Sequence, residues 1–300
     1  MAGARHREFK KLKRQIYESR TRQMQGQNAC PTFAPPCEGG PSPAEGFFGV
    51  SSLDAALPKG EIAAGAVHEF IPASRDDFPA ALGFMLCLLR RLTMQEALQD
   101  APILWCHVQG RAEFPSLPYL PGLAFSGTPV PRFLTVSARL EKDMLWALEE
   151  GLSMTRSPLI IGVNAGTEKL YDFTASRRLS LRASRHGSRL FLLRPHTAAT
   201  GSDQGRTTTA ATRWQISPRP SSPVKYRNSH TPAMGFPRWS ITLTRSKGGK
   251  TGTWILEWDH ETFSFHLASP LADRKPPARS QQPNPAAITP RTERRRQTGS

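Results

Sequence analysis

The residues with the clearest potential for chemistry follow the first apolar run of the chain, Ala66 to Ile71. At such a point a nucleotide-hydrolysing α/β protein carries a G-x-x-x-x-G-K-[S/T] loop, whose glycines bring backbone N–H groups onto phosphate. The stretch from Ile71 to Phe78 contains no glycine, and its adjacent Asp76 and Asp77 would repel a triphosphate. This stretch therefore argues against nucleotide hydrolysis.

Two later strand ends bear on the same chemistry. The run Ile103 to Val108 ends in Gln109, where a nucleotidase could place a carboxylate that activates water, and glutamine cannot accept that proton. The run 159–163 ends at Asn164, without an acidic metal ligand. Together with the loop, these departures predict a fold that has lost ATP hydrolysis. An unusual but active nucleotide site stays open as the alternative.

The sequence offers no other catalytic constellation. Cys106 and His107 are neighbours on a predicted strand, so their side chains point to opposite faces and cannot form a dyad. His68 lies in the middle of a predicted strand, where we expect a hydrogen-bonded core histidine. No histidine and cysteine pattern has zinc spacing. We therefore predict no enzymatic activity, no metal and no cofactor.

The elements that would position these residues follow from the apolar pattern. Short apolar runs alternate with helical patterns from residue 47 to 194, which predicts an α/β fold built from strand–helix–strand units. Nearly continuous apolar runs are typical of a parallel sheet that is buried on both faces. The strands are expected at 66–71, 103–108, 133–136, 159–163 and 190–193. The helices are expected at 78–99, 119–125, 140–155 and 172–186.

The pattern changes after residue 194. Residues 195–210 are polar and indicate a loop, and further strands are expected at 212–216, 239–243, 254–257 and 263–267. The segments 238–246 and 252–259 flank Lys247-Gly248-Gly249-Lys250, which is a hairpin signal. We therefore predict a twisted, mainly parallel sheet, flanked by helices, that ends in an antiparallel hairpin.

The formal net charge of +16 indicates a polyanionic partner but carries no information on the fold. Residues 1–23 carry +6, residues 24–173 carry −6, residues 174–230 carry +10 and residues 271–300 carry +5. The basic excess therefore lies at the two ends and in one central block. The largest segment is acidic.

The two ends differ in character. Phe9, Leu12 and Ile16 recur at helical spacing among basic residues, which predicts a basic amphipathic helix over 1–25. This helix docks on a partner or on phosphates, or it only keeps the chain soluble. Residues 26–46 have the composition of a linker, and residues 271–300 that of a disordered basic tail. The folded domain is expected over 47–270.

Arginines of the central block are the candidate contacts to DNA or to a partner. Arg178, Arg182 and Arg185 share one face of the helix predicted over 172–186, so they contact phosphate or an acidic surface, or they pair with the acidic half of the domain. Arg213 follows the polar loop and is a further candidate DNA contact. Trp214 is expected in the core rather than on a surface where bases stack.

No segment predicts a membrane span or export. The most apolar run, Ala80 to Leu89, is half of the roughly 20 residues that a spanning helix needs, and no apolar signal core follows the basic N-terminus. The four cysteines form no C-x-x-C pair, which favours a reducing compartment. We expect a cytoplasmic, nucleoid-associated protein.

Four stretches between residues 49 and 267 resemble the ImuA family of damage-inducible mutagenesis proteins, which are relatives of the RecA recombinase. They occur in the family's order along the chain. They are 49–58 with 67–69, 145–152, 172–179 through 194, and 210–214 with 254–260.

The resemblance implies a RecA-like fold and a role rather than a reaction. Proteins of this family work with a Y-family-like polymerase subunit of the ImuB type and an error-prone replicative-type polymerase of the same cassette, in SOS-induced translesion synthesis. The resemblance implies an interaction module without required ATPase chemistry, and it adds RecA and single-stranded DNA as candidate partners. The DNA-binding loops of RecA would correspond to 164–170 and 195–210. A single-stranded DNA-binding protein and an ATPase with a degenerate phosphate loop are the alternative functions.

Overall fold

The computed structural model describes residues 46–98, 100–109, 116–154, 159–164, 170–200, 207–223 and 234–268. The helices and short 3-10 turns are α2 (Ser51–Asp54), η1 (Pro58–Gly60), α3 (Phe78–Thr93), η2 (Glu96–Leu98), α4 (Leu120–Phe125), η3 (Val130–Arg132), α5 (Glu141–Leu152), α6 (Phe173–His186) and α7 (Thr197–Thr200). The strands are β1 (Ala66–Pro72), β2 (Ile103–Val108), β3 (Phe133–Ala138), β4 (Leu159–Val163), β5 (Arg189–Leu193), β6 (Thr212–Arg219), β7 (Arg238–Ser246), β8 (Gly252–Asp259) and β9 (Ser264–Leu267).

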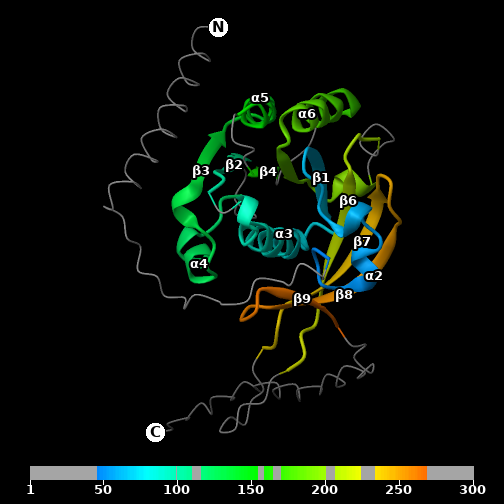
Figure 1. Cartoon of the computed structure of the whole chain (residues 1–300). Coiled ribbons are helices and arrows are strands. Elements are labelled where there is room, and N and C mark those ends of the chain that lie inside the picture. The colour runs from blue at the N-terminus through cyan, green and yellow to red at the C-terminus, as the bar shows by residue number, and fades with distance from the viewer. Residues whose placement is uncertain are drawn as a thin grey trace, which may run out of the picture. The chain divides into compact units, whose positions relative to one another are not determined.

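One sheet contains all nine of these strands, in the order β3-β2-β4-β5-β1-β6-β7-β8-β9. The pairs from β3 across to β6 are parallel, and those from β6 to β9 are antiparallel. The expected α/β class, with a mainly parallel sheet that ends in an antiparallel hairpin, is confirmed (Figure 1). Strand β6 pairs parallel with the central β1, so the antiparallel part begins only at β7.

Helices cover the two faces of the parallel part, because alternate residues of each buried strand point to opposite sides. Leu190 and Leu192 of β5 belong to the core under α5 and α6. Phe191 and Leu193 belong to the core around α3. Helix α3 therefore lies on one face, and α5 and α6 lie on the other (Figure 1).

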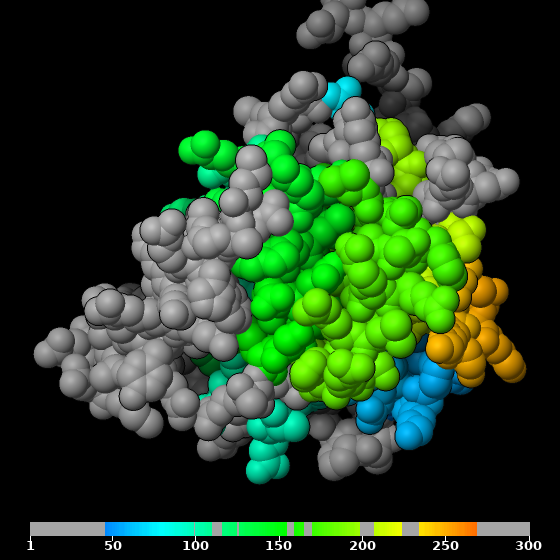
Figure 2. Space-filling model, turned by 90° about the horizontal axis from the view of Figure 1, so that it is seen from above, coloured from blue at the N-terminus to red at the C-terminus, as the bar shows by residue number. Residues whose placement is uncertain are grey.

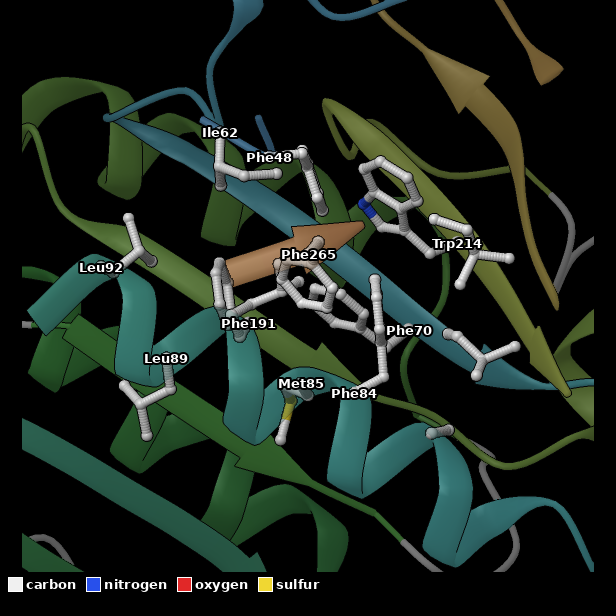
Figure 3. Packing of buried hydrophobic residues seen from close by; sticks show 14 of the residues in the cluster. Phe48, Ile62, Phe70, Phe84, Met85, Leu89, Leu92, Phe191, Trp214 and Phe265 are labelled. Carbon is white, nitrogen blue, oxygen red and sulfur yellow. The ribbon is translucent and has the colours of Figure 1, made fainter. Parts of the chain in front are cut away.

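Helix α3 is enclosed rather than laid on an open face. The ring centroid of Phe84 lies 6.4 Å from that of Phe70 on β1 and 5.5 Å from that of Phe265 on β9 (Figure 3). It also lies 5.7 Å from the ring centroid of Trp239 on β7. The guanidinium of Arg90 lies 4.2 Å from the ring centroid of Phe263. The late strands thus cover the side of α3 that faces away from β1, and they make this helix a core element.

The boundary of α3 differs from the expectation over 78–99. The helix ends at Thr93, whose hydroxyl donates to the carbonyl of Arg90 at 2.7 Å. That carbonyl would otherwise accept the N–H of Met94, which instead donates to Arg91 at 3.3 Å. Competition from the threonine side chain is the physical reason for the early end.

Helix α6 has a capping residue at each end. The side chain of Asp172 accepts the N–H of Ala175 at 2.7 Å, as an N-cap residue does. Gly187 follows the last turn with φ 67°, the left-handed conformation that glycine adopts without strain.

Within the described residues, no helix is long and apolar enough to cross a membrane.

Candidate functional site at the carboxyl edge of the sheet

The turn between β1 and α3 stands where a nucleotide-binding fold would hold phosphate. It comprises residues 73–77, with Asp76 exposed. The N–H of Ser74 donates to Oδ2 of Asp77 at 3.0 Å. A carboxylate of the chain itself therefore takes a donor that a phosphate-binding loop would offer to its ligand.

Other backbone donors of the turn are also satisfied internally. The N–H of Ala73 donates to the carbonyl of Ile216 at 2.8 Å, and that of Phe78 donates to Arg75 at 3.3 Å. Pro79, in the first turn of α3, has no N–H to offer. The helix start thus has fewer donors for an anion than an ordinary helix N-terminus.

Two strand ends that the sequence analysis named lie at the same edge. Gln109 follows β2 and is exposed, and its N–H donates to Ala138 at 2.7 Å. Asn164 follows β4 and is buried, and its N–H donates to Leu193 at 3.0 Å. Both side chains are amides, which cannot serve as a general base.

A buried carboxylate, Glu69 on β1, binds three side chains. Its Oε2 accepts from Nη1 of Arg194 at 3.1 Å and from Nε of Arg213 at 2.8 Å, and its Oε1 accepts the hydroxyl of Tyr171 at 2.8 Å. Glu69 and Arg194 are fully buried. The guanidinium of Arg194 also lies over the ring of Tyr171, 4.7 Å from its centroid. We call Glu69, Tyr171, Arg194 and Arg213 the Glu69 cluster.

Members of the Glu69 cluster border 164–170 and 195–210, the segments that the resemblance likens to the DNA-binding loops of RecA. Tyr171 follows the first of these segments, 164–170. Arg194 precedes the second, 195–210, and Arg213 follows it. Arg213 also donates from Nη2 to the hydroxyl of Thr208 at 3.3 Å. Tyr171 and Arg194 bind this carboxylate from the carboxyl edge of the sheet. Arg213 binds it from the start of β6, which runs parallel to β1 and begins at the amino edge.

The other members of the Glu69 cluster stabilise the ionised form of the Glu69 carboxyl group. Burial raises the pKa of the Glu69 carboxyl, but the guanidinium groups of Arg194 and Arg213 and the hydroxyl of Tyr171 outweigh it, so the pKa lies below its usual range. Sequence reasoning missed Glu69, Arg194 and Tyr171. The available signal was a lone Glu inside an apolar strand, because a buried charge requires a partner.

Two of the three predicted arginines of α6 are paired within the chain. Arg178 lies 2.9 Å from Oε1 of Glu149 on α5. Arg182 lies 3.5 Å from Oε2 of Glu149 and 3.6 Å from Glu150, and its Nη1 donates to the hydroxyl of Ser153 at 3.2 Å. The sequence left open whether these arginines contact an external partner or pair within the chain. In the structure, Arg178 and Arg182 pair with acidic residues of the same domain.

The remaining predicted contacts lie apart from one another. Arg185 is exposed near the end of α6, whereas Arg213 is held in the Glu69 cluster with its side chain 12% exposed. Phe9, Leu12 and Ile16 lie outside the described residues. The structure does not bring the arginines into one site, and their contacts to DNA or to a partner stay predictions.

Two histidines, His68 and His107, are buried and hydrogen-bonded. His68 is fully buried, and its ring nitrogens lie 2.8 Å from the hydroxyl of Thr212 and 3.0 Å from the carbonyl of Ala63, which confirms the expected hydrogen-bonded histidine. Burial lowers the pKa of His68 to about 4. His107 lies between the hydroxyls of Ser116 and Ser137 at 2.7 and 2.6 Å. The described ranges contain no group of three or more acidic, His or Cys residues that could hold a metal ion.

Comparison with known proteins shows the family of this chain. It is 33% identical over 237 residues to Protein ImuA of Caulobacter vibrioides strain NA1000, a match that covers 75% of this chain and 89% of that protein. The chain belongs to the ImuA family. The same values hold for the ImuA protein of strain ATCC 19089. No family model matches the chain. Among solved structures, the RadB recombinase is 11% identical and has a TM-score of 0.47, over 74% of this chain and 99% of that one.

Proposed function

We propose that this ImuA-family chain is a non-catalytic, RecA-related accessory protein of SOS-induced error-prone translesion synthesis. It acts at the nucleoid by binding the Y-family-like polymerase subunit of its cassette, and together with it serves the error-prone replicative-type polymerase. Family membership supports the link to mutagenesis. The architecture supports a RecA-related core.

The observation that carries the non-catalytic part is the hydrogen bonding of the β1–α3 turn. The carboxylate of Asp77 accepts the N–H of Ser74, and the N–H groups of Ala73 and Phe78 are bound to carbonyls. A bound triphosphate would have to displace these bonds and come close to Asp76 and Asp77. Such a turn favours a closed, rigid surface over a nucleotide site.

A pull-down with the purified polymerase subunit of the same cassette tests the binding part. Full-length protein is compared with a version that lacks residues 1–25. We expect the full-length protein to co-purify with the subunit, and the shortened one to do so less if the predicted amphipathic helix docks there. Failure of the full-length protein to co-purify with the subunit would contradict the proposal.

A second candidate function, direct binding of single-stranded DNA, is favoured by the Glu69 cluster. Tyr171 and Arg194 border the two segments that the resemblance likens to the DNA-binding loops of RecA, and both bind this carboxylate from the carboxyl edge of the sheet. DNA binding requires an affinity that falls linearly with the logarithm of the salt concentration. An oligonucleotide titration at several salt concentrations separates this candidate from pure protein docking.

A further inference from the structure

Helix α6 presents a row of exposed side chains that the Glu69 cluster and the arginine pairs do not use. Phe173, Arg177, Leu181 and Arg185 are four residues apart, so they follow one another along one side of the helix. All four are exposed, with Leu181 at 61% and Phe173 at 43%. We call these four residues the α6 stripe.

The other sides of α6 are occupied. Leu179 and Ala183 are fully buried toward the sheet. Arg178 and Arg182 bind α5, and the hydroxyl of Ser180 lies 2.8 Å from that of Thr209. The α6 stripe is therefore an exposed side of the helix that none of these contacts uses. Figure 2 shows α5 and α6, in green and yellow-green, beside each other on the molecule seen from above.

The two arginines of the α6 stripe differ from their neighbours in their electrostatics. Arg178 and Arg182 are neutralised by Glu149 and Glu150. No acidic side chain among the described residues lies within ion-pair distance of Arg177 or Arg185. The row thus alternates an apolar side chain with an uncompensated cation, twice.

We propose that the α6 stripe is the docking surface for an acidic amphipathic helix of a protein partner. Arg177 and Arg185 are eight residues apart, or about 12 Å along the helix axis at 1.5 Å per residue. A helix lying along α6 offers two carboxylates at the same eight-residue spacing, and the apolar residue midway between them covers Leu181. The inference rests on the proposed function, because it assigns this acidic helix to the polymerase subunit.

Charge complementarity excludes the chain's own ends as the occupant. Residues 1–23 carry +6 and residues 271–300 carry +5, so both are repelled by Arg177 and Arg185. A nucleic acid fits the α6 stripe less well than an acidic helix. Leu181, 61% exposed, offers neither charge nor a flat ring on which a base could stack, and Phe173 at the start of the helix is the one aromatic side chain of the stripe.

Two variants of the full-length protein test the α6 stripe. Arg177→Glu with Arg185→Glu reverses the two cations, and Leu181→Ser removes the apolar centre. Lys247→Glu with Lys250→Glu, on the exposed β7–β8 turn, changes the net charge by the same amount as the double arginine variant and serves as the control. Every altered residue is exposed, so we expect all three proteins to keep the melting temperature of the wild type.

Affinity for the purified polymerase subunit and for a single-stranded oligonucleotide is measured for each protein. We expect both stripe variants to bind the subunit roughly tenfold or more weakly than the wild type, and the lysine control to bind like the wild type. If the wild type binds the subunit and the stripe variants bind equally well, this inference is wrong while the proposed function stands. If the wild type does not bind the subunit, both fall. Loss of oligonucleotide binding with subunit binding intact would assign the stripe to nucleic acid instead.

Discussion

Nη1 of Arg194 lies 3.1 Å from Oε2 of Glu69, and neither side chain is exposed to solvent. The bond connects the end of β5 to the central strand β1, beside the stem of the 195–210 segment. A buried ion pair is costly to form, and removal of one partner leaves the other charged and unpaired. The Glu69 cluster is therefore sensitive to single substitutions.

Substitution of Glu69 by Gln is expected to lower the free energy of unfolding by about 3 kcal/mol, because two guanidinium groups lose their buried carboxylate. Urea denaturation of the full-length protein measures this loss. The matched control is Glu257→Gln, since Glu257 pairs with Arg238 at 2.6 Å but is more exposed, and it should cost less. An equal loss in the two variants would contradict the assigned importance of the cluster.

His68 predicts a dependence of stability on pH. Its pKa falls from 6.5 to about 4 on folding, because burial disfavours the charged ring. Between these values the unfolded chain binds a proton that the folded chain does not, so stability is complete above the unfolded pKa and falls as pH drops from about 6.5 toward 4. The expected loss is roughly 3 kcal/mol across that window.

Denaturation of the wild type and of His68→Asn at several pH values checks this expectation. The variant should be less stable at pH 7, because it replaces a hydrogen-bonded buried ring, but its stability should change less between pH 6.5 and 4. The low pKa of Glu69 adds a separate loss in both proteins, as pH falls below the ordinary glutamate value. Equal slopes from pH 6.5 to 4 would show that His68 does not titrate as described.

The β1–α3 turn predicts the absence of nucleotide binding. Magnesium-ATP should not raise the melting temperature of the full-length protein, because Asp76 and Asp77 repel the phosphates and Asp77 occupies the N–H of Ser74. A magnesium-dependent rise that responds to Asp76→Asn with Asp77→Asn would support the alternative of an ATPase with a degenerate loop.

The paired arginines of α6 are expected to act on stability and little on binding. Arg178→Ala with Arg182→Ala breaks the contacts to Glu149, which are partly exposed, and should cost about 1 kcal/mol. Oligonucleotide affinity in the same variant should stay within twofold of the wild type. A large drop would show that these arginines contact phosphate in spite of their pairing.

Most of the fold follows from local sequence patterns. The apolar runs at Ile103 to Val108 and at 159–163 are strands with those bounds, and Lys247-Gly248-Gly249-Lys250 joins β7 to β8 as predicted. Strand β9 was also expected, but its packing of Phe265 against Phe84 of α3 could not be predicted, because the two residues are far apart in the sequence and only the curvature of the sheet brings them together.

The candidate site was predicted less well. Helical spacing placed Arg178, Arg182 and Arg185 on one face of α6, but that spacing cannot show that Glu149 on α5 lies beside two of them. The Glu69 cluster draws its members from four separate segments, so no local pattern identifies it. Helical spacing does not single out the exposed Arg177, because this residue lies off the face predicted to carry Arg178 and Arg182.

The central claim is that this chain works by binding a polymerase partner without nucleotide chemistry. The most direct test is the dissociation constant of the full-length protein for the purified Y-family-like polymerase subunit, measured with and without magnesium-ATP. We predict binding at micromolar affinity or tighter, with the same dissociation constant in both conditions. No measurable binding, or binding that depends on ATP, would contradict the claim.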